Sequence, residues 1–230
     1  MANLRVGQYS GEYYGSFFNE SEPLTSAEMH QNARYIYEIL HFVHGWTMNA
    51  VCGMLGNMQA ESSINPGRWQ SDRVGSYSLG YGLVQWTPVT KYTNWCASNG
   101  WSDPSEMDAG IARILWEVEN REQWYATDSY DFSFKEFTQS TQSSGYLAKS
   151  FLLNYERPKD QSSSVQNYRA SLGEYWYSFI SSIDYTDPDV PVVPDVPDNP
   201  NFPDAPIIRK KRKSGYKFVL YANKNRRILK

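Results

Sequence analysis

Residues 48–66 read MNAVCGMLGNMQAESSINP, and this stretch decides the fold. Its apolar side chains recur at intervals of three or four residues, which predicts a helix with one buried face. The apolar positions are Met48, Val51, Cys52, Leu55 and Met58. Thr47 can cap the start of this helix, and the helix must end before Pro66. Glu61 therefore lies in the last turn, at the entrance to a polar loop.

Further helices are expected on both sides of this stretch. Thr25 and Glu28 have the spacing of a capping box, which predicts a helix over residues 26–43. The Asp-Pro pair at 103–104 predicts the cap and first turn of another helix. The capping-box spacing recurs at residues 133–136. These signals indicate that most of the body is helical.

Two more helices are predicted near the end of the body. The first contains Leu147, Phe151 and Tyr155, and Pro158 closes it. The last has a predicted apolar stripe at Val165, Tyr168, Leu172, Trp176 and Phe179.

Helical periodicity disappears between residues 63 and 89. Four glycines lie there among polar and aromatic residues: Gly67, Gly75, Gly80 and Gly82. This composition predicts turns and a short β-hairpin. The predicted fold class is therefore mainly α with a small β-hairpin insert.

Composition divides the chain into four parts. Residues 1–24 are predicted to form an irregular arm, and residues 25–183 to form the folded domain. Residues 184–206 are predicted to be an extended linker, because prolines recur at every third position. Residues 207–230 form a short basic tail with a possible hairpin.

Charge is distributed unevenly along the chain. Residues 207–230 hold ten Lys or Arg and no acidic residue, whereas residues 1–206 hold twelve basic and twenty-five acidic side chains. Since phosphate contacts dominate nucleic-acid affinity, the acidic body is a poor nucleic-acid binder, and only the tail could bind it. The tail could equally contact acidic neighbours, wall or membrane anions, or act as a solubilising extension.

Other classes of protein are disfavoured. No run of about twenty apolar residues and no signal peptide is visible, so neither a membrane span nor Sec-type export is expected. Cys52 fits a buried free thiol, and the three histidines do not stand at metal-ligand spacing. We expect no metal site and no cofactor.

Glu61 is the main candidate for chemistry. Met58 lies one turn before it and Trp69 a few residues after it, and apolar neighbours disfavour the charged form of a carboxylic acid. A general acid must be protonated near the working pH, which requires a raised pKa in a glutamate. The alternative is an ordinary solvated glutamate at a helix end.

Three motifs around Glu61 carry a family resemblance. Residues 59–66, QAESSINP, resemble the element that holds the catalytic glutamate in the lysozyme-like superfamily, as in goose-type lysozymes and lytic transglycosylases. Residues 80–88, GYGLVQWTP, resemble the element that lines their glycan groove. Together with residues 154–158, NYERP, these motifs look like the phage tail lysozyme family over about residues 26–180.

The resemblance implies a helical, lysozyme-like lobe that binds peptidoglycan, with Glu61 as the proton donor. Gln85 would present an amide to the sugar, and Tyr81 and Trp86 would offer stacking faces, unless they serve only packing. Tyr155 and Glu156 would line the far wall of the cleft, although Glu156 could instead form a structural ion pair with Arg157.

A second carboxylate is generally needed for glycoside hydrolysis. Asp72 is the candidate, because it is the first acidic residue after Glu61 and falls in the loop expected to face the cleft. One alternative is a solvated turn residue. Another is that Asp72 is dispensable, because goose-type lysozymes and lytic transglycosylases can lack an obvious partner in this place.

The predicted function is cleavage of the MurNAc–GlcNAc β-1,4 bond by an enzyme of a phage tail, made in the host cytoplasm and carried in the virion. Its expected partners are peptidoglycan and, through the linker and basic tail, other tail proteins. The alternatives are a lytic transglycosylase, a free endolysin, and a tail-tip protein that binds glycan without cutting it.

Overall fold

The structure, a computed structural model, describes residues 3–4, 15–16 and 24–183. Its α-helices are α1 (Ser26–Tyr37), α2 (Met48–Ser62), α3 (Val89–Ser98), α4 (Met107–Asn120), α5 (Phe134–Gln139), α6 (Ser144–Phe151) and α7 (Ser163–Ser181). Two π-helical segments, η1 (Glu38–Val43) and η3 (Leu152–Glu156), continue α1 and α6. A 3₁₀ turn, η2 (Gln70–Asp72), and a two-residue antiparallel pair, β1 (Asn3–Leu4) and β2 (Gly15–Ser16), complete the set. The prediction of a mainly helical domain is confirmed.

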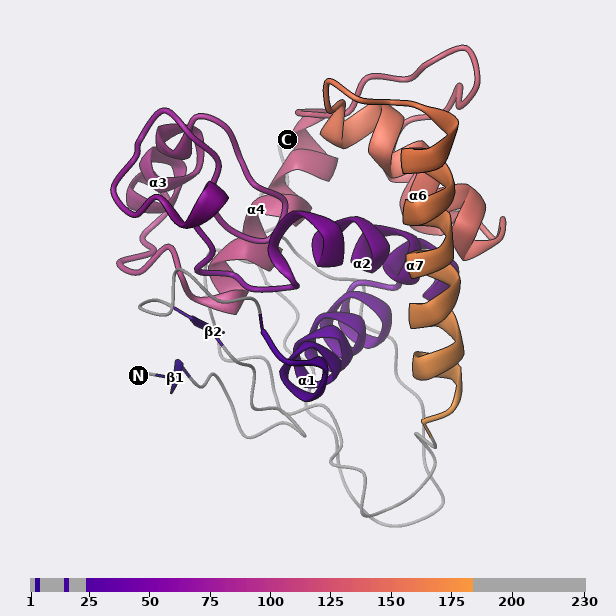
Figure 1. Cartoon of the computed structure of the whole chain (residues 1–230), viewed down its shortest axis with the longest axis horizontal. Coiled ribbons are helices and arrows are strands. Elements are labelled where there is room, and N and C mark those ends of the chain that lie inside the picture. Colours follow the sequence, from indigo (N-terminus) through magenta and orange to yellow (C-terminus); the bar gives the residue numbers. More distant parts are fainter. Residues whose placement is uncertain (1–2, 5–14, 17–23, 184–230) are drawn as a thin grey trace, which may run out of the picture.

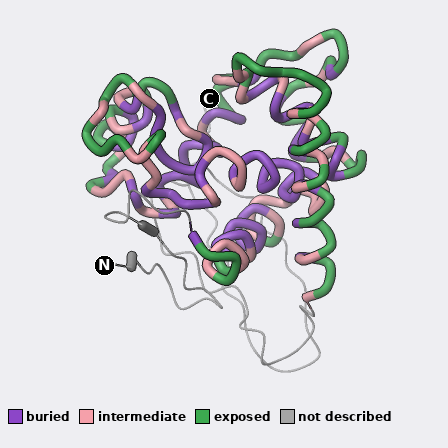
Figure 2. The backbone as a smooth tube through the Cα atoms, in the orientation of Figure 1, coloured by how far each residue is buried: buried purple, intermediate pink, exposed green. Residues whose placement is uncertain are grey.

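Helix α2 is the centre of the domain. It lies among α1, α6 and α7 (Figure 1), and nearly its whole length is buried (Figure 2). The apolar stripe predicted on it is buried at Val51, Cys52, Leu55 and Met58. Because α2 is enclosed on several sides, the side chain that it presents at its C-terminal end is held in a fixed position.

Two glycines allow α2 and α7 to approach closely. A Cβ atom added to Gly56 would lie 2.6 Å from the backbone nitrogen of Gly173. A Cβ atom added to Gly173 would lie 2.8 Å from the carbonyl oxygen of Ser144, at the start of α6. Both distances are shorter than van der Waals contact, so the crossing of these three helices depends on the absence of side chains at both positions.

The predicted helix starts are mostly confirmed. Thr25 and Glu28 form the capping box of α1, and Ser133 and Glu136 form that of α5. The Thr47 side chain accepts a hydrogen bond from the backbone N–H of Ala50 at the start of α2. Helix α4 is the exception, because it is capped at Glu106. The Asp103 carboxylate instead accepts hydrogen bonds from Ser105 in the preceding turn.

The predicted β-hairpin between residues 63 and 89 was wrong. Within residues 24–183 the chain forms no strand, and this segment makes only the isolated bridges Trp69–Tyr81 and Tyr81–Trp86. Left-handed backbone conformations at Ser71, Asp72 and Gln85 interrupt any ladder there, since a strand needs extended residues in sequence. The aromatic residues of the segment pack inward instead.

Helix α3 was not predicted. It starts after Pro88, and its buried residues Val89, Tyr92, Trp95 and Cys96 recur at helical spacing. The pattern was not recognised because it is short and directly follows a Gly-rich segment without helical periodicity.

The buried face of α7 also differs from the prediction. Tyr168 is 54% exposed, and the face turned towards α2 consists of Arg169, Gly173, Trp176 and Ile180. The prediction was right for Trp176, which is buried, and for Phe179, which packs against the core. It missed Arg169 and Gly173, because a charged residue and a glycine do not belong to an apolar pattern.

Most of the predicted arm, the proline-rich linker and the basic tail lie outside the described residues. In the part of the chain that is described, no helix is long and apolar enough to cross a membrane. Both cysteines are buried free thiols, as predicted for Cys52.

Candidate active site

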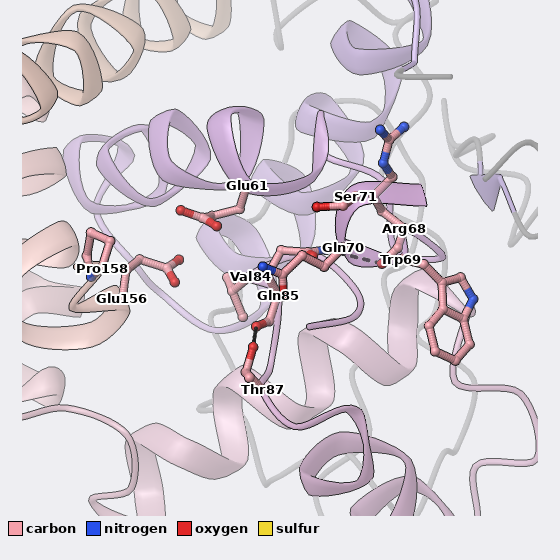
Figure 3. A pocket seen from close by; sticks show the side chains of 10 residues that line it. All are labelled: Glu61, Arg68, Trp69, Gln70, Ser71, Val84, Gln85, Thr87, Glu156 and Pro158. Carbon is pink, nitrogen blue, oxygen red and sulfur yellow. Dashed lines mark hydrogen bonds between the residues drawn. The ribbon is translucent and has the colours of Figure 1, made fainter. Parts of the chain in front are cut away.

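A pocket of about 350 Å³ opens at the C-terminal end of α2. Four segments meet around it: the last turn of α2, residues 68–71, residues 84–87, and the residues that end and follow η3. The carboxylates of Glu61 and Glu156 reach into it from two different segments and point towards one another (Figure 3). The pocket thus combines two acids with amide and hydroxyl groups.

Glu61 is partly exposed and paired with a cation. The Nη2 atom of Arg169 donates to Oε1 of Glu61 at 2.6 Å, and the Glu61 side chain is 21% exposed to solvent. Arg169 is buried, and its Nη1 atom also donates to the backbone oxygen of Asn57, at 2.9 Å. The surroundings of Glu61 are therefore less apolar than the sequence indicated.

A turn stabilised by hydrogen bonds fixes the end of α2. The helix ends where Ser63 and then Ile64 adopt left-handed conformations. The buried Ser62 hydroxyl donates to the backbone oxygens of Met58 and Leu83, at 3.0 and 2.9 Å. This contact joins the helix end to the 84–87 segment, so Glu61 and Gln85 are positioned relative to each other.

Glu156 is the second acid of the pocket. Its Oε1 atom is buried and accepts no hydrogen bond from the described residues. Burial raises its pKa well above the ordinary value, and the negative charge of Glu61 raises it further, while Arg169 acts in the opposite direction. No ion pair joins it to Arg157 in the described part of the chain, since that guanidinium lies over the ring of Tyr125 at 4.1 Å. Glu156 therefore favours its protonated form.

Gln85 contributes an amide to the pocket wall. Its Nε2 atom donates to the backbone oxygens of Arg68 and Gly82, at 3.1 and 3.0 Å, which fixes the orientation of the amide. Its Oε1 atom is buried and has no hydrogen-bond partner among the described residues. The oxygen is thus an unsatisfied acceptor in the pocket wall.

A buried glutamate beneath the pocket connects two of its walls. Glu117 of α4 accepts hydrogen bonds from Trp86 Nε1 at 3.0 Å, from Arg113 Nε at 2.9 Å and from the Tyr155 hydroxyl. Burial raises its pKa, and the charge of Arg113 and these hydrogen bonds oppose that effect. Trp86 and Tyr155 directly neighbour the pocket residues Gln85 and Glu156, so one carboxylate anchors both walls.

Comparison with known proteins identifies the family. Residues 31–180, which are more than half of the chain, match the family described as phage tail lysozyme. The chain belongs to the phage tail lysozyme family. The predicted family is confirmed, and membership implies a glycoside hydrolase.

The chain is similar to "Morphogenesis protein 1" of Bacillus phage B103, with 49% identity over 165 residues. The match covers 72% of this chain and 43% of that protein, so the chain matches less than half of the relative's length.

The phage tail lysozyme pocket brings together three of the seven residues that the sequence nominated: Glu61, Gln85 and Glu156. The other four do not line it. Tyr81, Trp86 and Tyr155 are at most 3% exposed and belong to the hydrophobic core, where Trp86 stacks on Tyr92. Their observed contacts are those of packing and anchoring residues.

Asp72 also lies outside the lining of the lysozyme pocket. Its Oδ1 atom forms an ion pair with Nη2 of Arg68 at 2.6 Å, and its side chain is 34% exposed. Asp72 adopts a left-handed conformation within the turn that contains η2. Asp72 is therefore a partly buried turn residue paired with Arg68, which itself lines the pocket.

Two pocket features of the phage tail lysozyme were missed. Arg169 was not nominated as a site residue. It lies four residues after Val165 and four before Gly173, on a helix face that could have been recognised as buried. Trp69 lines the pocket at the end away from the two acids (Figure 3), and it is the lining aromatic residue. Among the described residues, no three His, Cys, Asp or Glu side chains are grouped to hold a metal ion.

Proposed function

We propose that this protein is a peptidoglycan glycosidase that cleaves the MurNAc–GlcNAc β-1,4 bond in the pocket at the end of α2. The observation that carries the proposal is the pair of carboxylates, Glu61 and Glu156, in one open polar pocket of a phage tail lysozyme. Hydrolysis of a glycosidic bond requires an acid and an anionic carboxylate on the two sides of that bond.

In this proposal Glu61 donates the proton to the glycosidic oxygen. Its partial exposure at the pocket wall supports direct contact with a glycan. The unpartnered Gln85 oxygen accepts a hydrogen bond from an N–H or O–H group of the sugar, and Trp69 offers a ring at the other end of the pocket.

The proposed setting is the tail of a phage particle, where the enzyme opens the wall locally during genome entry. The family description and the name of the phage relative support this setting. The basic segment at residues 207–230 and the acidic composition before it support attachment to an acidic tail protein.

Digestion of purified cell walls tests the activity. We expect the wild-type protein to reduce the turbidity of a wall suspension and to release muropeptides with reducing MurNAc ends, as detected by mass spectrometry. Anhydro-MurNAc ends would instead identify a transglycosylase. Intact glycan strands with cleaved peptide stems would refute glycosidase activity, and binding to walls without any release would indicate a glycan-binding protein.

A further inference from the structure

The two carboxylates of the pocket occupy different environments. Glu61 of α2 is held by the Arg169 guanidinium of α7, whereas Oε1 of Glu156 is buried and accepts no hydrogen bond from any residue that the structure describes. A carboxylate that pairs with a cation is stabilised as an anion, and a buried carboxyl without a donor is stabilised as the neutral acid. The two carboxylates are therefore not equivalent, because Glu61 lies against a cation and burial favours the protonated form of Glu156.

We propose that Glu156 is the second catalytic carboxylate of this site and that it forms, with Glu61, a pair that carries a single proton. This inference rests on the proposed glycosidase function. It gives Glu156 the role that the sequence analysis considered for Asp72, and it assigns to Glu156 a part in the reaction beyond lining the cleft.

The charged groups around Glu156 are consistent with one proton for the pair. Negative charge comes from Glu61 of α2 and Glu117 of α4, and positive charge comes from Arg169 of α7 and the adjacent Arg157. Burial is the largest influence and favours the protonated form. When Glu61 is ionised, its charge further disfavours a second anion in the same pocket.

A single proton is the number that glycoside hydrolysis requires. Without glycan, the pair holds its proton on Glu156. The proposed reaction needs the proton on Glu61 and the negative charge on Glu156, so it requires transfer of the proton from Glu156 to Glu61 in the glycan complex, which leaves the total charge unchanged. Glu61 then donates the proton to the glycosidic oxygen as the bond to the anomeric carbon breaks, and the bonding electrons remain on that oxygen. The Glu156 carboxylate faces the positive charge that develops on the sugar and accepts a proton from the water that forms the new bond to the anomeric carbon, so the pair again carries one proton.

The experiment compares Glu156→Gln with the wild-type enzyme on soluble glycan fragments over a range of pH. Gln has nearly the same shape but cannot become an anion, so we expect kcat to fall about 100-fold or more, in the range typical of an acid–base group. The wild-type kcat should be bell-shaped in pH, because activity requires one proton on the pair. The acid limb should disappear in Glu156→Gln, because the variant has no second carboxyl group that must lose its proton.

Controls separate catalysis from binding and folding. Glu119→Gln makes the same change at an exposed position of α4 that does not line the pocket, and it should keep wild-type kcat. Glu156→Asp retains a carboxyl group, so it should keep both limbs at a reduced kcat. Thermal unfolding of each variant checks the fold. If Glu156→Gln does not fold, the kcat of Glu156→Asp and its dependence on pH test the proposal instead.

Two outcomes would overturn the proposal. One is a Glu156→Gln enzyme that keeps kcat within about threefold and both pH limbs while KM rises, as expected for a residue that only binds the sugar. The other is a folded Glu156→Asp enzyme that loses the acid limb although it keeps a carboxyl group. Failure of the proposed function is a separate result, because the wild-type protein itself would then release no muropeptides.

Discussion

Arg169 and Glu61 form an ion pair of 2.6 Å although they lie 108 residues apart in the sequence. The pair joins α7 to the last turn of α2, at the mouth of the pocket. Arg169 also donates to the backbone of Asn57, so its position is fixed by two contacts. The Arg169 guanidinium thus both joins α7 to α2 and places a positive charge beside Glu61.

Replacement of Arg169 should change the pH dependence of the enzyme. Arg169 opposes the upward shift in the pKa of Glu156, so Arg169→Met should raise that pKa further and delay loss of the last proton from the carboxylate pair. The alkaline limb of the activity profile should therefore move to higher pH in Arg169→Met and stay nearly in place in Arg169→Lys. An unchanged profile in a folded Arg169→Met enzyme would show that the guanidinium does not act on the pair.

Glu61→Gln should remove activity without removing the fold. The variant cannot donate a proton, and we expect kcat to fall by about 10²–10⁴, as for other general acids. Wall-digestion rates and thermal unfolding should be measured on the same preparation. Full activity in this variant would refute the assignment of Glu61.

Glu156→Gln should be more stable than the wild type at neutral pH. The pKa of Glu156 is raised in the folded protein, so the unfolded chain releases this proton at lower pH than the folded one does. Stability is therefore lost as pH rises from the ordinary pKa of a glutamate towards the raised value.

Urea unfolding at two pH values measures this difference. The free energies of unfolding of Glu156→Gln and wild type should agree near pH 4, where the glutamate is protonated in both states. At pH 7 the variant should be more stable, with a higher melting temperature than the wild type. Glu119→Gln should show no such divergence, and an equal response of all three proteins to pH would contradict the prediction.

Gly173→Ala should destabilise the domain. The new Cβ atom would lie 2.8 Å from the Ser144 carbonyl oxygen and 3.1 Å from the Ala148 Cβ atom, so α6 and α7 must move apart. Overpacking of this kind costs about 1–3 kcal/mol, and it should also lower activity because α7 carries Arg169. Ser171→Ala, on the exposed side of the same helix, should be close to wild type in melting temperature.

Asp72→Asn should change kcat by less than about threefold, well below the loss of 10²–10⁴ expected for an acid–base group. Asp72 pairs with Arg68 and does not line the pocket, so its substitution weakens only a partly exposed ion pair. Steady-state kinetics should measure the kcat values of Asp72→Asn and Glu156→Gln side by side. A large loss in Asp72→Asn with wild-type activity in Glu156→Gln would restore the original choice of second carboxylate.

The sequence predicted the elements whose signals are local. Capping boxes at Thr25 and Ser133 and the apolar stripe of α2 depend on residues a few positions apart, and each predicted a helix that forms. The hairpin prediction failed because glycines and aromatic residues indicate a turn-rich segment but not whether its backbone is extended. Tertiary packing decided that question.

The site was predicted in part for the same reason. Glu61, Gln85 and Glu156 each lie in a short motif, and all three line the pocket. Arg169 is defined only by the crossing of α7 over α2, and the neighbours Trp86 and Tyr155 turn inward to Glu117 instead of outward to a ligand. Motifs therefore located the segments of the site, and burial decided which side chain of each segment reaches it.

The Glu117 anchor has a consequence for how such an enzyme can change over generations. Three residues from different segments, Trp86, Arg113 and Tyr155, donate to one buried carboxylate. Loss of any single donor removes a hydrogen bond from the buried Glu117 carboxylate. Replacement of the carboxylate and all three donors by apolar residues would leave no unpaired polar group. The walls of the pocket are therefore expected to diversify through joint replacement of this group, while single substitutions at these positions are selected against.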